Sequence, residues 1–302
     1  MICPPICDPA PVYSHFFFLT SELLRTKAHI TMAVQMFNKM TFSSVYRKYM
    51  FPVSDEILNM VLSYVKEKTD GRPLEMAVDA GCGTGRYTLP LALHFKKVLG
   101  VDISESQINV AKQHTLANNV SYMVAPAEKL PLKNASVDLV NAALAAHWFT
   151  PDKFASEAVR VLKTNGCLAA HAFIPTTKIE YKNFSHELSV VMSEVWDTLY
   201  QHDDKSTEHM FCQYRSIYEA IPLKDKERIT DISVKVQMSI PEIIGFFKSI
   251  FMYQVFMEKD AEGAQQLLIQ AEKRLQKILG EEADSALLDA VMTHYCVLAC
   301  KH

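Results

Sequence analysis

Two aspartates and three glycines have the residue types and spacing to bind a small molecule. An apolar run ends in Asp79, and Gly81, Gly83 and Gly85 then alternate with small residues, while a second apolar run ends in Asp102. This arrangement is typical of a nucleotide-type ligand held between the ends of two parallel strands. The Asp102 carboxylate only accepts hydrogen bonds, so it suits the two hydroxyl groups of a ribose.

Asp79 and Arg86, which stand on either side of the glycine loop, indicate the class of ligand. A dinucleotide site has glycine at the position of Arg86, and Asp79 would be poorly placed beside a pyrophosphate. A carboxylate there suits a cation, directly or through water. S-adenosyl-L-methionine carries a sulfonium and an ammonium and has no phosphate, so it fits better than a nicotinamide cofactor. The alternative is a tight strand-to-helix turn that binds nothing.

The order of motifs resembles that of the Rossmann-like (class I) S-adenosylmethionine-dependent methyltransferases. Five segments carry the resemblance: 79–85, 101–104, 126–131, 136–140 and 160–166. Thr164 and Asn165 depart from the usual Pro-Gly of the last segment, and Pro126 replaces a frequent acid beside the adenine. Residues 45–52 are similar to the segment that closes over the cofactor in the branch containing trans-aconitate methyltransferase, except at Met50.

The resemblance implies S-adenosyl-L-methionine as the cofactor and a set of residues that contact it. These are Asp79, Gly81, Gly83, Gly85, Asp102, Ile103, Ala127, Glu128 and Tyr46. With Pro126 in place of an acid, we expect main-chain groups, packing and Glu128 to hold the adenine.

The methyl acceptor should bind beyond the fourth strand, where His147 and Trp148 follow the apolar run. His147 could orient an anionic or hydroxyl acceptor or remove a proton; alternatively it only bonds the main chain. A base is needed only if the nucleophile is protonated. We expect Trp148 to wall the pocket. Trp196, Tyr214 and Tyr253 are further pocket candidates, although aromatic residues at helical spacing are usually core.

These residues predict a methyltransferase that acts on a small molecule by in-line transfer. A carboxylate O-acceptor follows from the resemblance alone, and a hydroxyl or amine acceptor is nearly as compatible with the residues. The alternative is a catalytically inactive S-adenosylmethionine-binding protein with a regulatory or partner role.

Alternating strand and helix patterns must position these residues. Strands are predicted at 75–79, 97–101, 121–124, 137–144, 167–173, 232–238 and 294–300, and helices at 54–68, 86–94, 104–118, 151–162, 180–220, 241–256 and 261–279. The pattern predicts an α/β, Rossmann-like, mostly parallel seven-stranded sheet with helices on both faces and a helical insertion after strand five.

We expect one methyltransferase domain over 32–302, after a disordered extension at 1–31. Its parts are an N-terminal helical cap (32–70), the cofactor-binding core (71–175), a helical substrate-side insertion (176–230) and C-terminal strands and helices that complete the sheet (231–302).

Composition excludes several classes of partner. The net charge of −3 leaves no surplus of basic residues for a nucleic-acid backbone, and no apolar run is long enough to span a membrane. Seven scattered cysteines indicate reduced thiols and a cytoplasmic protein, with no metal site. We expect a monomer or weak dimer with a small-molecule acceptor as its partner.

Overall fold

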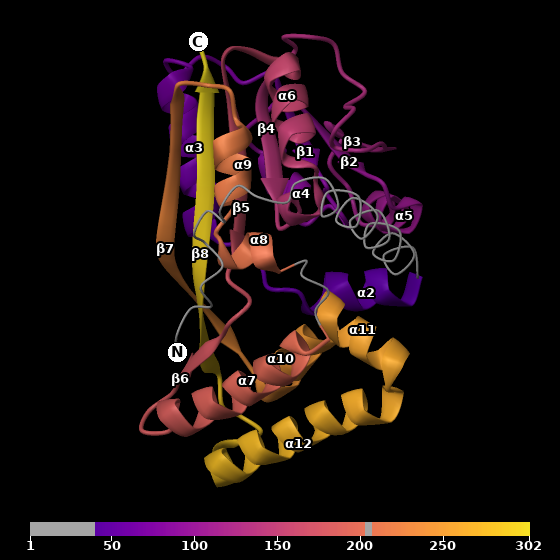
Figure 1. The fold of residues 1–302 in the computed structure, drawn as a ribbon, viewed down its shortest axis with the longest axis vertical. Coiled ribbons are helices and arrows are strands. Elements are labelled where there is room, and N and C mark those ends of the chain that lie inside the picture. Colours follow the sequence, from indigo (N-terminus) through magenta and orange to yellow (C-terminus); the bar gives the residue numbers. More distant parts are fainter. Residues whose placement is uncertain (1–39, 203–206) are drawn as a thin grey trace, which may run out of the picture.

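The computed structural model describes residues 40–202 and 207–302, and a mostly parallel sheet lies at their centre (Figure 1). Its strands are β1 (Met76–Ala80), β2 (Lys97–Asp102), β3 (Val120–Val124), β4 (Val137–Ala143), β5 (Leu162–Phe173), β6 (Lys178–Glu180), β7 (Asp225–Met238) and β8 (Leu288–Lys301). They run in the order β3-β2-β1-β4-β5-β8-β6, with β7 also paired to β8. β1 to β5 are parallel, and β8 is antiparallel to its partners. The predicted extension at 1–31 lies outside the described residues.

The expected α/β fold is confirmed, but the sheet has eight strands instead of the predicted seven. The additional strand is β6, which pairs with β8 at residues 289–291. β7 occupies the other edge of β8 along its length, so β6 continues the line of β5. A segment of three residues is too short for an alternation pattern to be recognised, so the sequence carries no strand signal here.

Helices cover both faces of the sheet. They are α2 (Met40–Tyr49), α3 (Asp55–Lys68), α4 (Thr88–Leu91), α5 (Glu105–Gln113), α6 (Pro151–Val161), α7 (Ser185–Tyr200), α8 (Glu208–Phe211), α9 (Arg215–Ala220), α10 (Ile240–Lys248), α11 (Phe251–Lys259) and α12 (Ala261–Leu279), with 3-10 turns η1 (Ala146–Trp148) and η2 (Gly280–Glu282). The apolar sides of α3 and α4 pack on one face, and those of α6 and α9 on the other.

Local sequence signals predict some helix ends correctly and others incorrectly. Ser104 caps α5 as expected, because its hydroxyl accepts the Gln107 N–H at 3.2 Å. The helix predicted over 86–94 shortens to the single turn of α4. The helix predicted over 241–256 breaks into α10 and α11 at Ser249, whose hydroxyl bonds the Phe246 carbonyl at 2.6 Å.

A group of helices gathers at one end of the sheet. α7, from the insertion after β5, packs with α10, α11 and α12, from the segment between β7 and β8, and α2 contacts both α10 and α5 (Figure 1). Two segments far apart in sequence therefore build one helical cap over the sheet end. Within the described residues no single helix is long and apolar enough to cross a bilayer.

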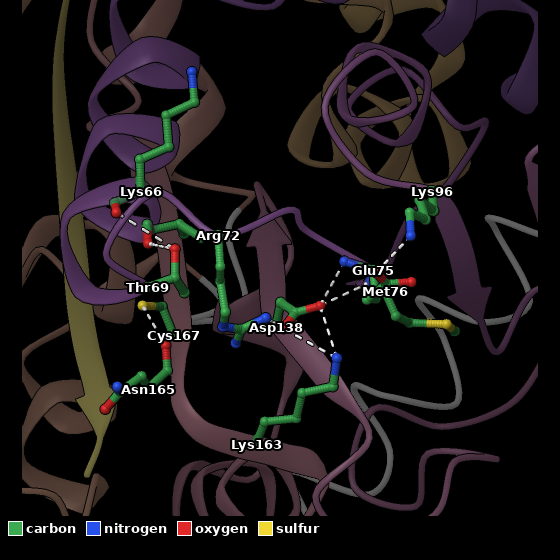
Figure 2. Close-up of polar contacts among 11 residues, drawn as sticks. Lys66, Thr69, Arg72, Glu75, Met76, Lys96, Asp138, Lys163, Asn165 and Cys167 are labelled. Carbon is green, nitrogen blue, oxygen red and sulfur yellow. Dashed lines mark hydrogen bonds and ion pairs between the residues drawn. The ribbon is translucent and has the colours of Figure 1, made fainter.

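A buried carboxylate fixes the start of β1 against β4 and β5 (Figure 2). Asp138 Oδ2 accepts the main-chain N–H groups of Glu75 and Met76 at 2.8 and 2.9 Å. The Arg72 guanidinium lies 2.7 Å from Oδ1, and the Lys163 ammonium 3.0 Å from Oδ2. Burial raises the pKa of Asp138, but these four partners together hold it below its usual value. Asp138 therefore has a structural role.

Candidate functional site

The glycine loop leaves the end of β1 with three residues in the left-handed region. Gly81, Gly83 and Gly85 have φ of 69°, 52° and 78°. A Cβ on Gly81 would lie 2.5 Å from the Ala145 Cβ, so only glycine fits this close approach. The loop is also bonded to β2, since the Gly83 N–H donates to Asp102 Oδ2 at 2.9 Å.

A first cavity of about 250 Å³ lies at the carboxyl ends of β1, β2 and β4. Every cofactor residue expected from the sequence except Gly85 lines it: Tyr46, Asp79, Gly81, Gly83, Asp102, Ile103, Ala127 and Glu128. Gly85 closes the loop beneath it, where an added Cβ would lie 2.4 Å from the Tyr122 hydroxyl. This is the position at which open α/β sheets bind nucleotide-type ligands.

Asp79 supplies a buried carboxylate in the first cavity. The Thr88 hydroxyl donates to Oδ2 at 2.6 Å and the Asn141 amide to Oδ1 at 2.8 Å, which fixes its orientation. Burial raises its pKa to about 6, and these two bonds only partly oppose this effect. A carboxylate that costs free energy to ionise in a buried site favours a cationic ligand beside it. The ammonium of S-adenosyl-L-methionine fits this requirement.

The opposite end of the first cavity suits the nucleoside. Asp102 holds the loop and the start of α5, because its Oδ1 accepts the Ser104 N–H at 2.8 Å, and carboxylate lone pairs remain for a ribose. Ile103 is 44% exposed beside Ala127, so the two offer apolar surface to a base. Glu128 Oε1 accepts the Thr150 N–H at 2.9 Å, which ties this carboxylate to the start of α6.

Arg86 closes the first cavity on the side of α2. Its guanidinium donates to the Phe51 carbonyl at 2.9 Å and to the Arg47 carbonyl, and Arg47 in turn donates to the Thr84 carbonyl at 2.9 Å. These bonds hold the expected closing segment, with Tyr46, against the glycine loop. From the sequence, Arg86 only argues against a pyrophosphate, because no local pattern indicates its contact with residues 47 and 51.

A second cavity of about 90 Å³ adjoins the first, and Tyr46, Leu144 and Trp148 line both. Its wall is mostly aromatic and apolar: Phe42, Met50, Phe173, Trp196, Phe251 and Met252 are among the contributors. Apart from the Tyr46 hydroxyl and the indole N–H groups, the polar side chains are those of His147, Thr207 and Ser249, and no charged residue is present among its described lining residues. A small apolar molecule therefore fits here, next to the ligand of the first cavity.

The junction of the two cavities holds two unusual groups. Leu144 has φ of 53°, a strained conformation for a branched residue, and its N–H donates to the His171 carbonyl at 2.9 Å. Burial raises the pKa of Tyr46 to about 12, so its hydroxyl stays protonated. The sequence carries no signal for the strain at Leu144.

The four aromatic residues that the sequence predicts for the acceptor pocket differ in their position relative to the second cavity. Trp148 and Trp196 line the second cavity, and the Trp196 indole N–H donates to the Thr177 hydroxyl at 3.4 Å. Tyr214 lies behind the wall and bonds His147. Tyr253 lines neither cavity and packs in the helical core, while its neighbour Met252 lines the second cavity.

His147 lines the second cavity from η1, directly after β4. Its Nδ1 lies 2.9 Å from the Tyr214 hydroxyl, and its ring is partly exposed. Burial, and to a smaller extent the nearby His209, lower its pKa to about 3. His147 is therefore neutral at physiological pH.

Comparisons with known proteins agree with this geometry. Residues 78–170 match the family described as "Methyltransferase domain". A Dictyostelium discoideum protein named as a methyltransferase is 29% identical over 264 residues, which span 86% of this chain and 94% of that protein. A malonyl-[acyl-carrier protein] O-methyltransferase of Methylococcus capsulatus is 34% identical over 116 residues, or 37% of this chain and 42% of that enzyme. The solved structure of an Anaeromyxobacter dehalogenans protein named as a type II methyltransferase has the same fold, with a TM-score of 0.63 and 23% identity over 80% of this chain and 97% of that one.

Proposed function

Since this chain is an S-adenosyl-L-methionine-dependent methyltransferase, we propose that it methylates a carboxylate oxygen of a small molecule whose remaining part is apolar. The observation that carries the proposal is the second cavity, which adjoins the cofactor site at Tyr46, Leu144 and Trp148 and has an apolar, uncharged lining among the described residues. The cofactor, when bound, supplies a methyl group already activated by a positive sulfur.

The lining of the second cavity limits the charge of the acceptor. A di- or tricarboxylate would bring several charges into a wall whose described residues include no lysine or arginine, and each unpaired buried charge is costly. A single carboxylate directed at the first cavity is offset by the positive charge of the cofactor. The lining therefore favours a monocarboxylate over the tricarboxylate acceptors of the trans-aconitate branch.

A carboxylate also fits the available catalytic groups. It is ionised at neutral pH and needs no general base, so the protein has only to align its oxygen with the methyl carbon. Tyr46, Leu144 and Trp148 shape the passage in which the two reactants meet. O-methylation is also the activity in the name of the malonyl-[acyl-carrier protein] relative.

The alternative of a non-catalytic cofactor-binding protein predicts a filled or collapsed space beside His147. The cavity of about 90 Å³ at this position supports a catalytic site instead.

The test uses three probes with one apolar chain and different head groups: hexanoic acid, hexanol and hexylamine. Each is incubated with the full chain and methyl-labelled S-adenosyl-L-methionine, with Asp102→Ala as the cofactor-deficient control. We expect label in hexanoic acid as an ester that mild base hydrolyses to labelled methanol. Label only in the alcohol or amine would overturn the carboxylate assignment. Absence of transfer to all three probes and to a metabolite extract, with intact cofactor binding in calorimetry, would favour the non-catalytic alternative.

A further inference from the structure

The contact between His147 and Tyr214 joins two rigidly placed side chains. Tyr214 is fully buried and precedes α9 with φ of 54°, and its ring meets Tyr295 edge-on at a centroid distance of 5.0 Å. Its hydroxyl lies 2.9 Å from His147 Nδ1, across 67 positions of sequence. His147 Nε2 has no hydrogen-bond partner within residues 40–202 and 207–302, and the ring borders the second cavity.

The other partners of the Tyr214 hydroxyl fix the direction of this bond. The main-chain N–H groups of Ala146 and His147 face its oxygen and partly oppose the rise in its pKa that burial causes. The hydroxyl proton is therefore free to be donated to His147 Nδ1, which must be unprotonated to accept it. A neutral imidazole with an unprotonated Nδ1 carries its one proton on Nε2. The low pKa of His147 keeps the ring neutral.

We infer that Tyr214 is a positioning residue that holds His147 with its proton on Nε2, so that His147 donates a hydrogen bond to the acceptor and removes no proton. The inference rests on the proposed function for the identity of the acceptor. One carboxylate oxygen accepts the Nε2–H, and the other forms the bond to the methyl carbon. The carbon–sulfur bond breaks, its electron pair stays on sulfur, and no proton moves.

This arrangement selects the acceptor by the protonation of its nucleophilic atom. Carboxylates enter ready to react, whereas alcohols and ammonium groups would need a base that His147 in this tautomer does not provide. The titratable groups around His147 are Tyr46 on α2, His209 on α8, and the neighbouring Tyr214 and Tyr295. The pKa values of the three tyrosines are raised by burial and that of His209 is lowered by burial, so all four are neutral at physiological pH.

The first test is independent of activity. Long-range proton–nitrogen NMR of protein labelled with ¹⁵N-histidine reports the protonation of each ring nitrogen, and a His147→Gln sample identifies the His147 signals. We expect an unprotonated Nδ1 and a protonated Nε2 at neutral pH, and a mixture of tautomers in Tyr214→Phe. Protonation of Nδ1, or an unchanged tautomer in Tyr214→Phe, would overturn the inference even if the acceptor class is different.

The matched control is Tyr295→Phe. The Tyr295 hydroxyl is equally buried beside Tyr214 and has no hydrogen-bond partner in the described residues. Its removal should leave the His147 tautomer and the kinetics unchanged.

The second test separates a donor from a base by kinetics with hexanoic acid. We expect Tyr214→Phe to lower kcat/KM about tenfold without changing the Kd for S-adenosyl-L-methionine. His147→Gln retains an N–H donor and should stay several-fold more active than His147→Ala. Equal losses in the two His147 variants, or a kcat/KM at saturating S-adenosyl-L-methionine whose rise with pH disappears in His147→Gln, would assign a base instead.

Discussion

The guanidinium of Arg86, at the end of the glycine loop, donates a hydrogen bond to the main-chain carbonyl of Phe51 at 2.9 Å. A second bond joins the same guanidinium to the Arg47 carbonyl, so one side chain connects the cofactor loop to the segment between α2 and α3. Because Tyr46 lies on α2 and lines both cavities, this contact couples closure of the cofactor site to the wall of the second cavity.

We predict that Arg86→Lys weakens cofactor binding. An ammonium cannot bond both carbonyls in the planar geometry of a guanidinium, so α2 should separate from the loop more often. We expect the Kd for S-adenosyl-L-methionine in calorimetry to rise about tenfold, from the loss of one charged hydrogen bond. Hydrogen exchange over residues 42–51 should also become faster.

The control for Arg86→Lys is Arg274→Lys. Arg274 is half-exposed on α12 and pairs with Glu194, far from the loop in sequence and outside both cavity linings. This variant should bind and exchange as the wild type does. A normal Kd and normal exchange in Arg86→Lys would show that the two carbonyl contacts do not hold α2 in place.

Asp79 predicts a pH-dependent cofactor affinity. Its pKa of about 6 in the free protein should fall when a cationic ligand binds beside it, so binding releases a proton. The affinity for S-adenosyl-L-methionine should therefore be constant above about pH 7 and decrease as the pH falls below about 6. Calorimetry in buffers of different ionisation enthalpy measures both the affinity and the released proton.

Asp79→Asn is the matching variant, because it keeps the shape and removes the titration. Burial also raises the pKa of Asp102, so any pH dependence that survives in Asp79→Asn belongs to another group. Without ligand, the raised pKa of Asp79 means that the folded state binds the proton more tightly than the unfolded chain. Its contribution to the unfolding free energy therefore decreases as the pH rises from about 4 to about 6. An Asp79→Asn protein with wild-type affinity and pH dependence would contradict its assignment to the cationic end.

Asp138 predicts a purely structural effect. Asp138→Asn leaves Arg72 and Lys163 without their shared carboxylate and presents an amide to N–H donors (Figure 2). We expect a loss of about 3 kcal/mol in the free energy of unfolding, measured with urea, because one partner of a buried charge network is removed. Glu75→Gln breaks a half-exposed pair with Lys96 and should cost less than about 1 kcal/mol. A similar loss of unfolding free energy in both variants would mean that the buried charge network of Asp138 stabilises the fold no more than an exposed ion pair.

The sequence predicted the cofactor half of the site because its determinants are local. Gly83 needs only its own backbone conformation, Ser104 caps the helix that follows it, and Asp102 ends the strand beside β1. These signals lie within a few residues of the groups they position. Parallel strands then bring them to one edge of the sheet.

The acceptor half depends on contacts between distant segments. The wall of the second cavity comes from α2, η1, β5, α7 and the break between α10 and α11, and no local pattern states how these meet. The sequence pattern predicts Tyr253 as a pocket residue, but in the structure its neighbour Met252 lines the second cavity. Which face of a helix borders a cavity cannot be predicted before the segments packed against that helix are known. The cytoplasmic location and the monomeric or weakly dimeric state remain predictions from sequence alone.

The size of the second cavity gives the last prediction, which concerns acceptor length. Ile250 lines this cavity at the break between α10 and α11 and is only partly buried, so Ile250→Ala should enlarge the space at a modest cost in stability. We expect the ratio of kcat/KM for decanoic acid to that for hexanoic acid to rise about tenfold, since two or more additional methylene groups become buried. The Kd for S-adenosyl-L-methionine should stay the same, because Ile250 does not line the first cavity. Ile278→Ala removes an equally sized, partly buried side chain from the same helical core without touching either cavity, and it should leave the ratio unchanged. If both variants shift the ratio alike, the preference follows from the stability of the helical cap; if neither does, the apolar part of the acceptor lies elsewhere.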